Sequence, residues 1–274
     1  MTSDGMLSKG YAFPSSFSLK RARADTMRLQ RHLCEWFDEI PGKLLLEQEK
    51  QCLAKILPGL FGYYLVQIGY FGCLPDVVAN ARIRNYIVVT EEAEGDGDTA
   101  LIKGEISRLP IATDSVDAVL MPHSLDFSLD PHQVLREAER VLIPEGRVVI
   151  VGFNPASLWG MWHLSRRRSR VFPWDTQFLP LRRLLDWLSL LGFDVERVHQ
   201  LMYRPPLRTE RLMRRLAFLE RAGGHWWPLK GGVYVVEAVK RVSTLTPVDP
   251  LWKRAPFDVL GARTAEPTTR QGHQ

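Results

Sequence analysis

The clearest alternation of apolar and polar residues lies between residues 104 and 153. Val116 to Met121 is a nearly continuous apolar run, which is typical of a strand that is covered on both faces. Asp130 then stands where an N-cap accepts free backbone N–H groups, and Pro131 occupies the first helical position. A second apolar run extends from Arg147 to Phe153. The order of strand, helix and strand predicts a right-handed parallel crossover.

The helix of this crossover is amphipathic. Its apolar residues recur at helical spacing and are predicted to pack on the sheet: Val134, Leu135, Ala138, Val141 and Leu142. The charged residues among them are predicted to face water: Arg136, Glu137, Glu139 and Arg140. Pro144 and Gly146 are predicted to end the helix.

Similar patterns before and after this segment predict the rest of an α/β sheet. Further strands are predicted at residues 63–68, 86–90, 100–103, 193–200 and 233–239. Helices are predicted at residues 29–40, 46–57, 178–191 and 208–221, with an aromatic connection at 154–180. The first of these helices would present Leu33 and Phe37 to the core, and the second Leu53 and Ile56.

Composition narrows the class of protein. In 274 residues, 45% are hydrophobic and 24% are charged, as in ordinary soluble globular proteins of one or two domains. Cys34, Cys52 and Cys73 are too far apart for a disulfide framework or a metal cluster, so we expect a reducing, cytoplasmic location and no metal. No secretory signal is visible. Residues 56–75 lack charge, but their prolines and glycines argue against a membrane span.

Residues 104–151 resemble the second half of the class I S-adenosylmethionine-dependent methyltransferase domain, in its small-molecule-type branch. The run G-D-x-x-x-L-P-F-x-x-x-S-F-D-x-V is present as Gly104, Glu105, Leu109, Pro110, Ile111, Ser115, Val116, Asp117 and Val119. The run D-P-x-x-x-L-x-E-x-x-R-V-L-x-P-x-G is present as Asp130, Pro131, Leu135, Glu137, Arg140, Val141, Leu142, Pro144 and Gly146. Weaker agreement extends from Leu44 to Arg241.

The resemblance implies a Rossmann-like α/β fold. We expect a mostly parallel sheet of seven strands, in which the last strand is antiparallel and inserts between its neighbours. Residues 1–57 would then be a leader and helices that cap the cofactor cleft, although packing alone would explain these helices equally well. Residues 58–241 would form the methyltransferase-like domain, and the proline-bearing residues 242–274 a disordered tail.

The resemblance also implies S-adenosyl-L-methionine as the cofactor. The family places an acidic residue and G-x-G-x-G after the first strand, where a Cβ would collide with the cofactor. Here Gly69 matches the first glycine and Gly72 is displaced by one residue. Phe71 and Cys73 replace the other glycines, and Gln67 replaces the acid. A turn that binds no ligand is the alternative interpretation.

Other cofactor contacts follow from the matched positions. Glu91 would accept the ribose hydroxyls, because a carboxylate is an acceptor only; a place in a solvated acidic loop is the alternative. Glu105 would approach the adenine amino group, with Ile106 beside the ring. Pro122 and His123 would line the floor of the cleft. His123 would act as a catalytic base or, alternatively, as a packing or orienting residue.

Aromatic and basic residues follow this part of the chain. Trp159 and Trp162 lie where the resembled fold often builds its acceptor pocket; ordinary packing is the alternative. From His163 to Arg221 there are thirteen arginines, no lysine and six acids, a local balance of +7 (13 − 6). Three hypotheses therefore stand: methyl transfer to a small-molecule acceptor, a degenerate scaffold, and an RNA-binding protein. The oligomeric state is left open.

Overall fold

The crossover expected from the sequence forms the centre of the sheet. In the computed structural model, β4 (Val116–Pro122) is followed by α4 (Pro131–Val141) and by β5 (Leu142–Phe153), parallel to β4. Asp130 caps α4, because its Oδ1 accepts a hydrogen bond from the backbone N–H of Gln133 at 3.0 Å. The strand β5 begins at Leu142, directly after the helix and earlier than predicted. The structure describes residues 33, 35–69, 74–91, 100–166, 178–207, 209–223 and 230–242.

These residues include a seven-stranded sheet of order β3-β2-β1-β4-β5-β7-β6. The other strands are β1 (Phe61–Ile68), β2 (Arg82–Thr90), β3 (Ala100–Lys103), β6 (Phe193–Leu201) and β7 (Val233–Lys240). The last strand, β7, is antiparallel to both β5 and β6, between which it lies. The predicted Rossmann-like topology, with its inserted final strand, is confirmed.

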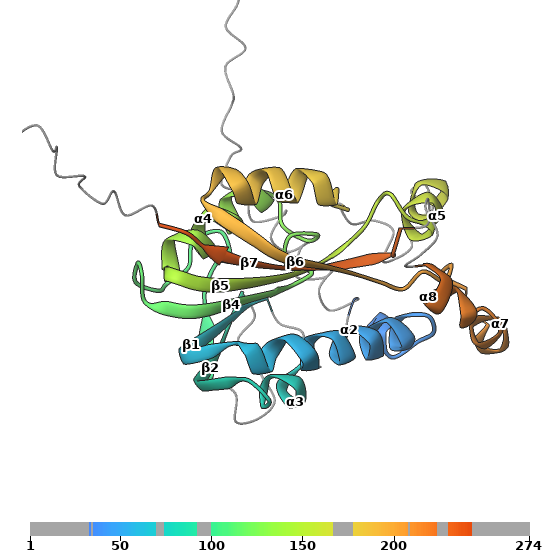
Figure 1. Cartoon of the computed structure of the whole chain (residues 1–274), viewed down its shortest axis with the longest axis horizontal. Coiled ribbons are helices and arrows are strands. Elements are labelled where there is room, and N and C mark those ends of the chain that lie inside the picture. Colours follow the sequence, from blue (N-terminus) through green and yellow to red (C-terminus); the bar gives the residue numbers. More distant parts are fainter. Residues whose placement is uncertain are drawn as a thin grey trace, which may run out of the picture. The chain divides into compact units, whose positions relative to one another are not determined.

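Helices cover both faces of this sheet (Figure 1). On one face lie α2 (Gly42–Ile56) and α3 (Pro75–Val78), and on the other lie α4 and α6 (Leu181–Leu190). Within β4, Ala118 and Leu120 join the core on the α2 side, and Val119 and Met121 join the core on the α4 side. Because successive side chains point to opposite faces, a strand between two helical layers must be apolar throughout.

Three segments differ from the predictions. Residues 158–166 form a helix, α5 (Leu158–Arg166), where a connection was expected. A capping signal was present there, since the hydroxyl of Ser157 accepts the backbone N–H of Gly160 at 3.1 Å. The basic helix predicted at 208–221 is two short helices, α7 (Glu210–Arg215) and α8 (Phe218–Gly223). The helix predicted from residue 178 begins only after Pro180.

The N-terminal apolar pattern serves packing. Leu33, Phe37, Leu53 and Ile56 are buried against the sheet, as predicted. A role of these helices in covering the cofactor stays a prediction. Residues 1–32 and 243–274, to which the predicted leader and disordered tail belong, lie outside the described residues. Within the part of the chain that the structure describes, no helix has the length and hydropathy needed to cross a membrane.

Candidate active site

The sheet changes its winding direction between β1 and β4. From β1 the chain winds outward through β2 and β3, whereas β4 and β5 lie on the other side of β1. Ligands of open α/β sheets bind beyond the carboxyl ends of the strands at such a point. The hydroxyl of Ser124, which follows β4, donates a hydrogen bond to the carbonyl oxygen of Ile68 at the end of β1. The two strand ends at the switch point are thereby held together.

Gly69 lies directly at this point. Its φ is +84°, a left-handed conformation that favours glycine, and its N–H donates to the carbonyl oxygen of Val89 at 2.9 Å. The buried side chain of Gln67 donates from Nε2 to the carbonyl oxygen of Gly69 at 3.0 Å, and its Oε1 accepts the hydroxyl of Tyr86 at 2.6 Å. The amide that replaces the family's acid therefore fixes the turn without a charge. Gly72 and its neighbours Phe71 and Cys73 lie outside the described residues.

The next two strand ends carry the predicted acids. Glu91 follows β2 and is partly exposed. Glu105 follows β3, and its Oε1 accepts the hydroxyl of Ser107 at 2.5 Å. Ile106 is buried beside it. Gly104 allows the chain to turn tightly here, because a Cβ at this position would lie 2.7 Å from the ring of Pro110. The sheet thus brings Gly69, Glu91 and Glu105 to three adjacent strand ends.

The loop that carries Glu105 is braced by α4. The backbone N–H of Leu109 donates to Glu137 Oε2 at 2.8 Å, and Arg140 donates to the carbonyl oxygens of Leu109 and Ile111 at 3.1 and 2.9 Å. Arg140 also pairs with Glu137 at 2.8 Å and holds the pKa of its carboxyl below the usual value. The prediction that both face water was wrong: long polar side chains at the helix flank reach the adjacent loop. Arg136 is exposed, as predicted.

His123, which follows Pro122 at the end of β4, is buried between two carboxyl groups. Its side chain is 1% exposed; Nδ1 lies 3.0 Å from Asp126 Oδ2, and Nε2 lies 3.0 Å from Glu49 Oε1. Burial alone would lower the pKa of His123, but Glu49 and Asp126 together raise it to about 9. Asp126 is itself fixed by the backbone N–H of Phe153, which donates to it at 3.0 Å. His123 is therefore an imidazolium at neutral pH, with both ring nitrogens engaged.

Sequence reasoning missed Glu49 and Asp126. Glu49 is contributed by α2, and its neighbour Gln48 accepts the backbone N–H of Met202 after β6 at 3.0 Å. A signal existed, since Glu49 interrupts the apolar face of α2 between Leu45 and Leu53, where an acid needs a buried partner. The partner's identity depends on the fold.

Of the two aromatic residues predicted to line the acceptor pocket, Trp159 packs in the core instead. Trp159 is fully buried, with its ring 6.4 Å from Phe153 and 5.9 Å from Trp36. The ring of Phe153 also lies 4.3 Å from His123 and 4.9 Å from Phe178. These contacts form a continuous aromatic layer at the carboxyl ends of β4 and β5, which shields the His123 charge cluster from water.

A family model described as "Methyltransferase domain" matches residues 74–150, from the end of the glycine turn to β5. The fold is similar to that of the SAM-dependent methyltransferase TM1293 from Thermotoga maritima. That similarity has a TM-score of 0.56 and 18% identity, and covers 80% of this chain and 100% of the other. Residues 74–150 thus match the methyltransferase-domain family, and the sheet that contains them has the fold of class I methyltransferases. This domain implies S-adenosyl-L-methionine as its cofactor.

Two further similarities extend over the methyltransferase domain. The Escherichia coli protein YafS, itself uncharacterized, is 35% identical over 160 residues, which are 58% of this chain and 65% of YafS. The match thus spans slightly less than two thirds of that relative. A chain of the complex between the Haloferax volcanii Trm112 methyltransferase activator and a methyltransferase has a TM-score of 0.55 and 16% identity, covering 77% of this chain and 98% of the other. At such identities the solved structures show the fold alone.

The residues of the methyltransferase domain fit this cofactor at the strand ends. Gly69 leaves the end of β1 without a side chain in a left-handed conformation, so a ligand could approach the backbone there. Glu91 and Glu105 place acceptor groups at the next two strand ends, where hydroxyl and amino donors would lie. At Gln67 a buried amide stands in place of a carboxylate, so no charge at this position faces an ammonium group.

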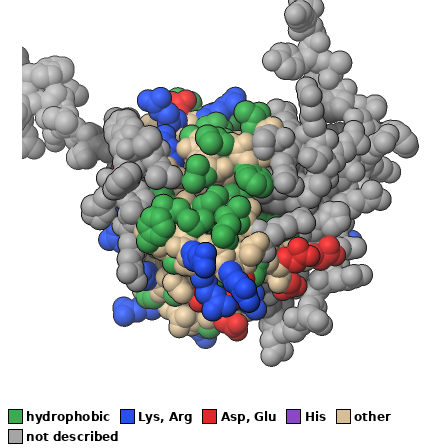
Figure 2. Space-filling model, turned by 90° about the vertical axis from the view of Figure 1, so that its right-hand side faces the viewer, with side chains coloured by type: hydrophobic (Ala, Val, Ile, Leu, Met, Phe, Trp, Pro, Cys, Tyr) green, Lys and Arg blue, Asp and Glu red, His purple; other side chains and the backbone are tan. Residues whose placement is uncertain are grey.

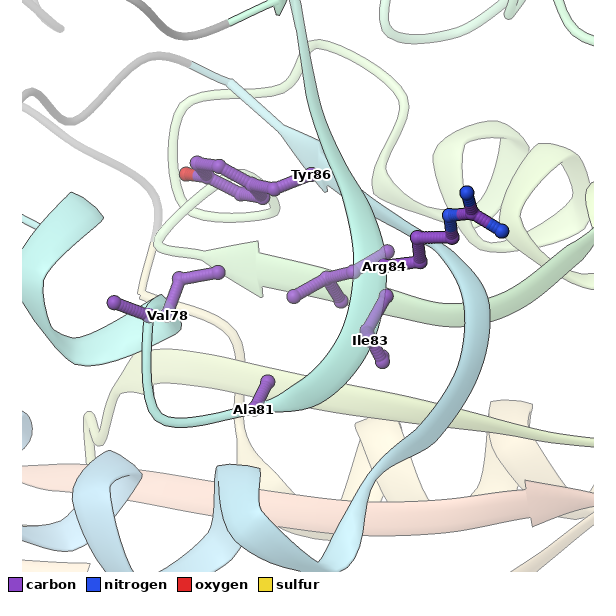
Figure 3. A pocket seen from close by; sticks show the side chains of 7 residues that line it. Val78, Ala81, Ile83, Arg84 and Tyr86 are labelled. Atoms are coloured by element: carbon purple, nitrogen blue, oxygen red, sulfur yellow. The ribbon is translucent and has the colours of Figure 1, made fainter.

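A separate cavity of about 220 Å³ lies alongside the strands rather than beyond their ends. It is bounded by α3, the turn that follows, β1 and β2, and its lining is apolar at Leu65, Val78 and Ile83 (Figure 3). The side chain of Arg84 is directed away from it, and the ring of Tyr86 forms one wall (Figure 3). Because α3 has only four residues, it leaves part of this face uncovered. Arg84 is a charged residue of the lining, but no acid that could accept the cofactor's donors is among the described residues that line the cavity.

Proposed function

We propose that the methyltransferase domain binds S-adenosyl-L-methionine across the carboxyl ends of β1, β2 and β3 and transfers its methyl group to a small-molecule acceptor by in-line displacement. The observation that carries this proposal is the left-handed Gly69 at the switch point of the sheet. Among the described residues, this is where a backbone turn without a side chain meets the strand ends that carry Glu91 and Glu105.

Each predicted site residue takes a role in this proposal. Gly69, with Gly72 in the same turn, would let the chain approach the methionine part of the cofactor. Glu91 would accept hydrogen bonds from the ribose hydroxyls, and Glu105 from the adenine amino group. Ile106 would contact the adenine ring. Pro122, whose ring offers no backbone donor, would form the floor between cofactor and acceptor.

The cofactor, when bound, supplies a methyl carbon activated by a positively charged sulfur. An acceptor's lone pair would take up this methyl group, and the electron pair of the carbon–sulfur bond would stay on the departing thioether sulfur. The protein's contribution is then alignment at about 3 Å and exclusion of water. The acceptor's proton passes to solvent. We assign His123 a structural role, because its ring is already protonated and both nitrogens are held by carboxyl groups.

One observation favours the alternative of a cofactor-free scaffold. Gln67 uses both ends of its amide inside the protein, on Gly69 and on Tyr86, where the family keeps a free carboxylate. A domain with this arrangement would retain the fold while binding no S-adenosyl-L-methionine. Both readings are decided by the same titration.

The deciding experiment compares two glycines of similar conformation. Gly69 and Gly192 have φ values of +84° and +80°, so alanine strains the backbone similarly at both, by about 1 kcal/mol. Gly192 ends α6, far from the switch point along the sheet, and only Arg241 O lies near a Cβ there. Isothermal titration calorimetry with S-adenosyl-L-methionine and S-adenosylhomocysteine would be run on the native protein, Gly69→Ala and Gly192→Ala.

We expect micromolar binding by the native protein, a loss of affinity of at least about tenfold in Gly69→Ala, and unchanged affinity in Gly192→Ala. Thermal unfolding should show similar losses in both variants, which separates folding from binding. Absence of heat with the native protein would support the scaffold and end the enzyme proposal. Equal affinity losses in the two variants would place the cofactor elsewhere.

A further inference from the structure

Large apolar side chains are exposed where α5, α7 and α8 meet water. Met161 and Leu164 on α5 are 65% and 71% exposed, and Leu212 on α7 and Phe218 on α8 are 44% and 59% exposed. We call this surface the α5–α8 face. These helices lie at one end of the sheet, beyond the carboxyl end of β5 (Figure 1).

The helices of the α5–α8 face are fixed to one another through Arg204. Its carbonyl oxygen accepts the indole N–H of Trp159 on α5 at 2.7 Å. Its guanidinium donates to the carbonyl oxygen of Met213 on α7 at 3.1 Å and to Glu220 on α8 at 2.9 Å. The three helices that carry the exposed apolar side chains are therefore joined through one residue.

The pattern within α5 is unusual for a helix on a water-facing surface. Trp159 and Gly160 point inward and are buried, as expected of a helix that packs on a core. Met161 and Leu164, three residues apart and hence on one side, occupy the outer side, where polar residues are the rule. Figure 2 shows hydrophobic side chains gathered in one patch on this end of the molecule. Contiguous exposed apolar surface of this kind marks an interaction site.

Positive charge borders the apolar side chains. Arg211, Arg214 and Arg215 of α7 are exposed, and Lys and Arg side chains lie directly beside the hydrophobic patch in Figure 2. Arg214 pairs with Glu210 at 2.5 Å, which leaves the surface with a net positive balance.

We propose that the α5–α8 face binds the surface of an anionic lipid bilayer, with its apolar side chains in the headgroup region and its arginines on lipid phosphates. Amphipathic surfaces bind bilayers through buried apolar area together with attraction to anionic lipids, at about 1 kcal/mol per arginine near the surface. RNA would meet the arginines equally well and has Phe218 to stack on, but the other three exposed apolar side chains, Met161, Leu164 and Leu212, are aliphatic and offer no ring for stacking. The exposed aliphatic side chains favour the bilayer.

The test is sedimentation with vesicles, in the absence of cofactor and acceptor, so its outcome is independent of methyl transfer. One set of vesicles contains phosphatidylcholine alone, and the other contains about one third phosphatidylglycerol. Leu164→Asp and Phe218→Asp probe the face. Leu190→Asp and Phe61→Asp are matched controls, because these side chains are 74% and 75% exposed and lie outside the α5–α8 face, at the last residue of α6 and the first residue of β1. All four substituted side chains are exposed, so the fold should persist, as circular dichroism would check.

We expect the native protein and both controls to sediment with anionic vesicles and not with neutral ones, and to be released by high salt. Leu164→Asp and Phe218→Asp should each weaken this binding by about tenfold. Failure of the native protein to bind anionic vesicles would overturn the proposal, as would equal losses in the control variants. Retention on single-stranded RNA that persists in Leu164→Asp, or a lipid-free dimer that this variant abolishes, would assign the face to RNA or to a second copy.

Discussion

His123 carries a buried positive charge because carboxyl groups from two distant parts of the chain contact its ring. Glu49 comes from α2 and Asp126 from the turn after β4, and each lies 3.0 Å from a ring nitrogen. A buried charge without such partners would cost several kcal/mol. The result is a connection between α2 and the floor of the candidate site that depends on the proton of His123.

This connection predicts how stability depends on pH. The pKa of His123 is about 9 in the folded protein against 6.5 ordinarily, so its contribution is complete below about pH 6.5 and is lost as the pH rises toward 9. The free energy of unfolding of the native protein should fall by about 3 kcal/mol over this range relative to His123→Gln. Urea unfolding of the native protein and of His123→Gln at about pH 6.5 and about pH 9 measures this difference in stability.

His132→Gln serves as the control, because His132 lies on α4 and its ring contacts Trp187. It should keep the pH dependence of the native protein. If His123→Gln shows the same fall in stability as the native protein, the buried His123 is not the group that loses its proton.

At the scale of elements, the E-x-x-R spacing of α4 explains the position of the loop that carries Glu105. Residues three apart lie on the same side of a helix, so Glu137 and Arg140 reach that loop together. They satisfy its backbone N–H and carbonyl groups at Leu109 and Ile111. The E-x-x-R spacing, which is part of the methyltransferase resemblance, thus has a structural role in this chain, because it holds the loop that carries Glu105.

Arg140→Met should therefore weaken cofactor binding, although Arg140 itself is not among the residues proposed to contact the cofactor. Loss of the bonds to the two carbonyl oxygens frees the loop, and we expect about a tenfold loss of affinity for S-adenosyl-L-methionine, with a drop in stability of about 1 to 2 kcal/mol. Arg136→Met, on the exposed side of the same helix, should change neither. Calorimetric titration and thermal unfolding measure the two effects. Unchanged affinity in Arg140→Met would show that the brace does not position Glu105.

At the scale of the whole molecule, the last strand is anchored at its end by Lys240. Its Nζ donates to the carbonyl oxygens of Glu139 and Leu142 at 2.8 Å each, and to Asp114 at 2.9 Å. One buried lysine therefore connects β7 to the end of α4 and the start of β5, segments about a hundred residues earlier in the chain.

Lys240→Met should lower the free energy of unfolding by about 3 kcal/mol, because one buried and one partly buried carbonyl oxygen lose their donor. Arg241→Met is the matched control: the neighbouring cation is half exposed and pairs with Glu145 and Asp194 at the surface, where such pairs contribute about 0 to 1 kcal/mol. Denaturant unfolding compares the two. Equal losses of stability in the two variants would show that Lys240 contributes no more to stability than a surface ion pair does.

Local pattern alone determined much of this protein. The apolar run of β4, the capped helix after Asp130 and the order of strands and helices predicted the sheet, because a strand between two helical layers must be apolar and a parallel crossover needs a helix. Gly69 could be placed in a turn because it directly follows the apolar run of a predicted strand. The short helix α5 was missed, since its apolar residues lie on both sides and give no clear periodicity.

Only the tertiary structure decided the partners of the polar residues. Glu49 contacts His123, which lies 74 residues later in the sequence, and Gln67 accepts a hydrogen bond from the hydroxyl of Tyr86 on the neighbouring strand. Such pairs depend on which elements lie side by side, and the periodicity of a single segment does not determine this arrangement. Local spacing determines which face of an element is buried, whereas contacts between elements determine which buried charges find a partner.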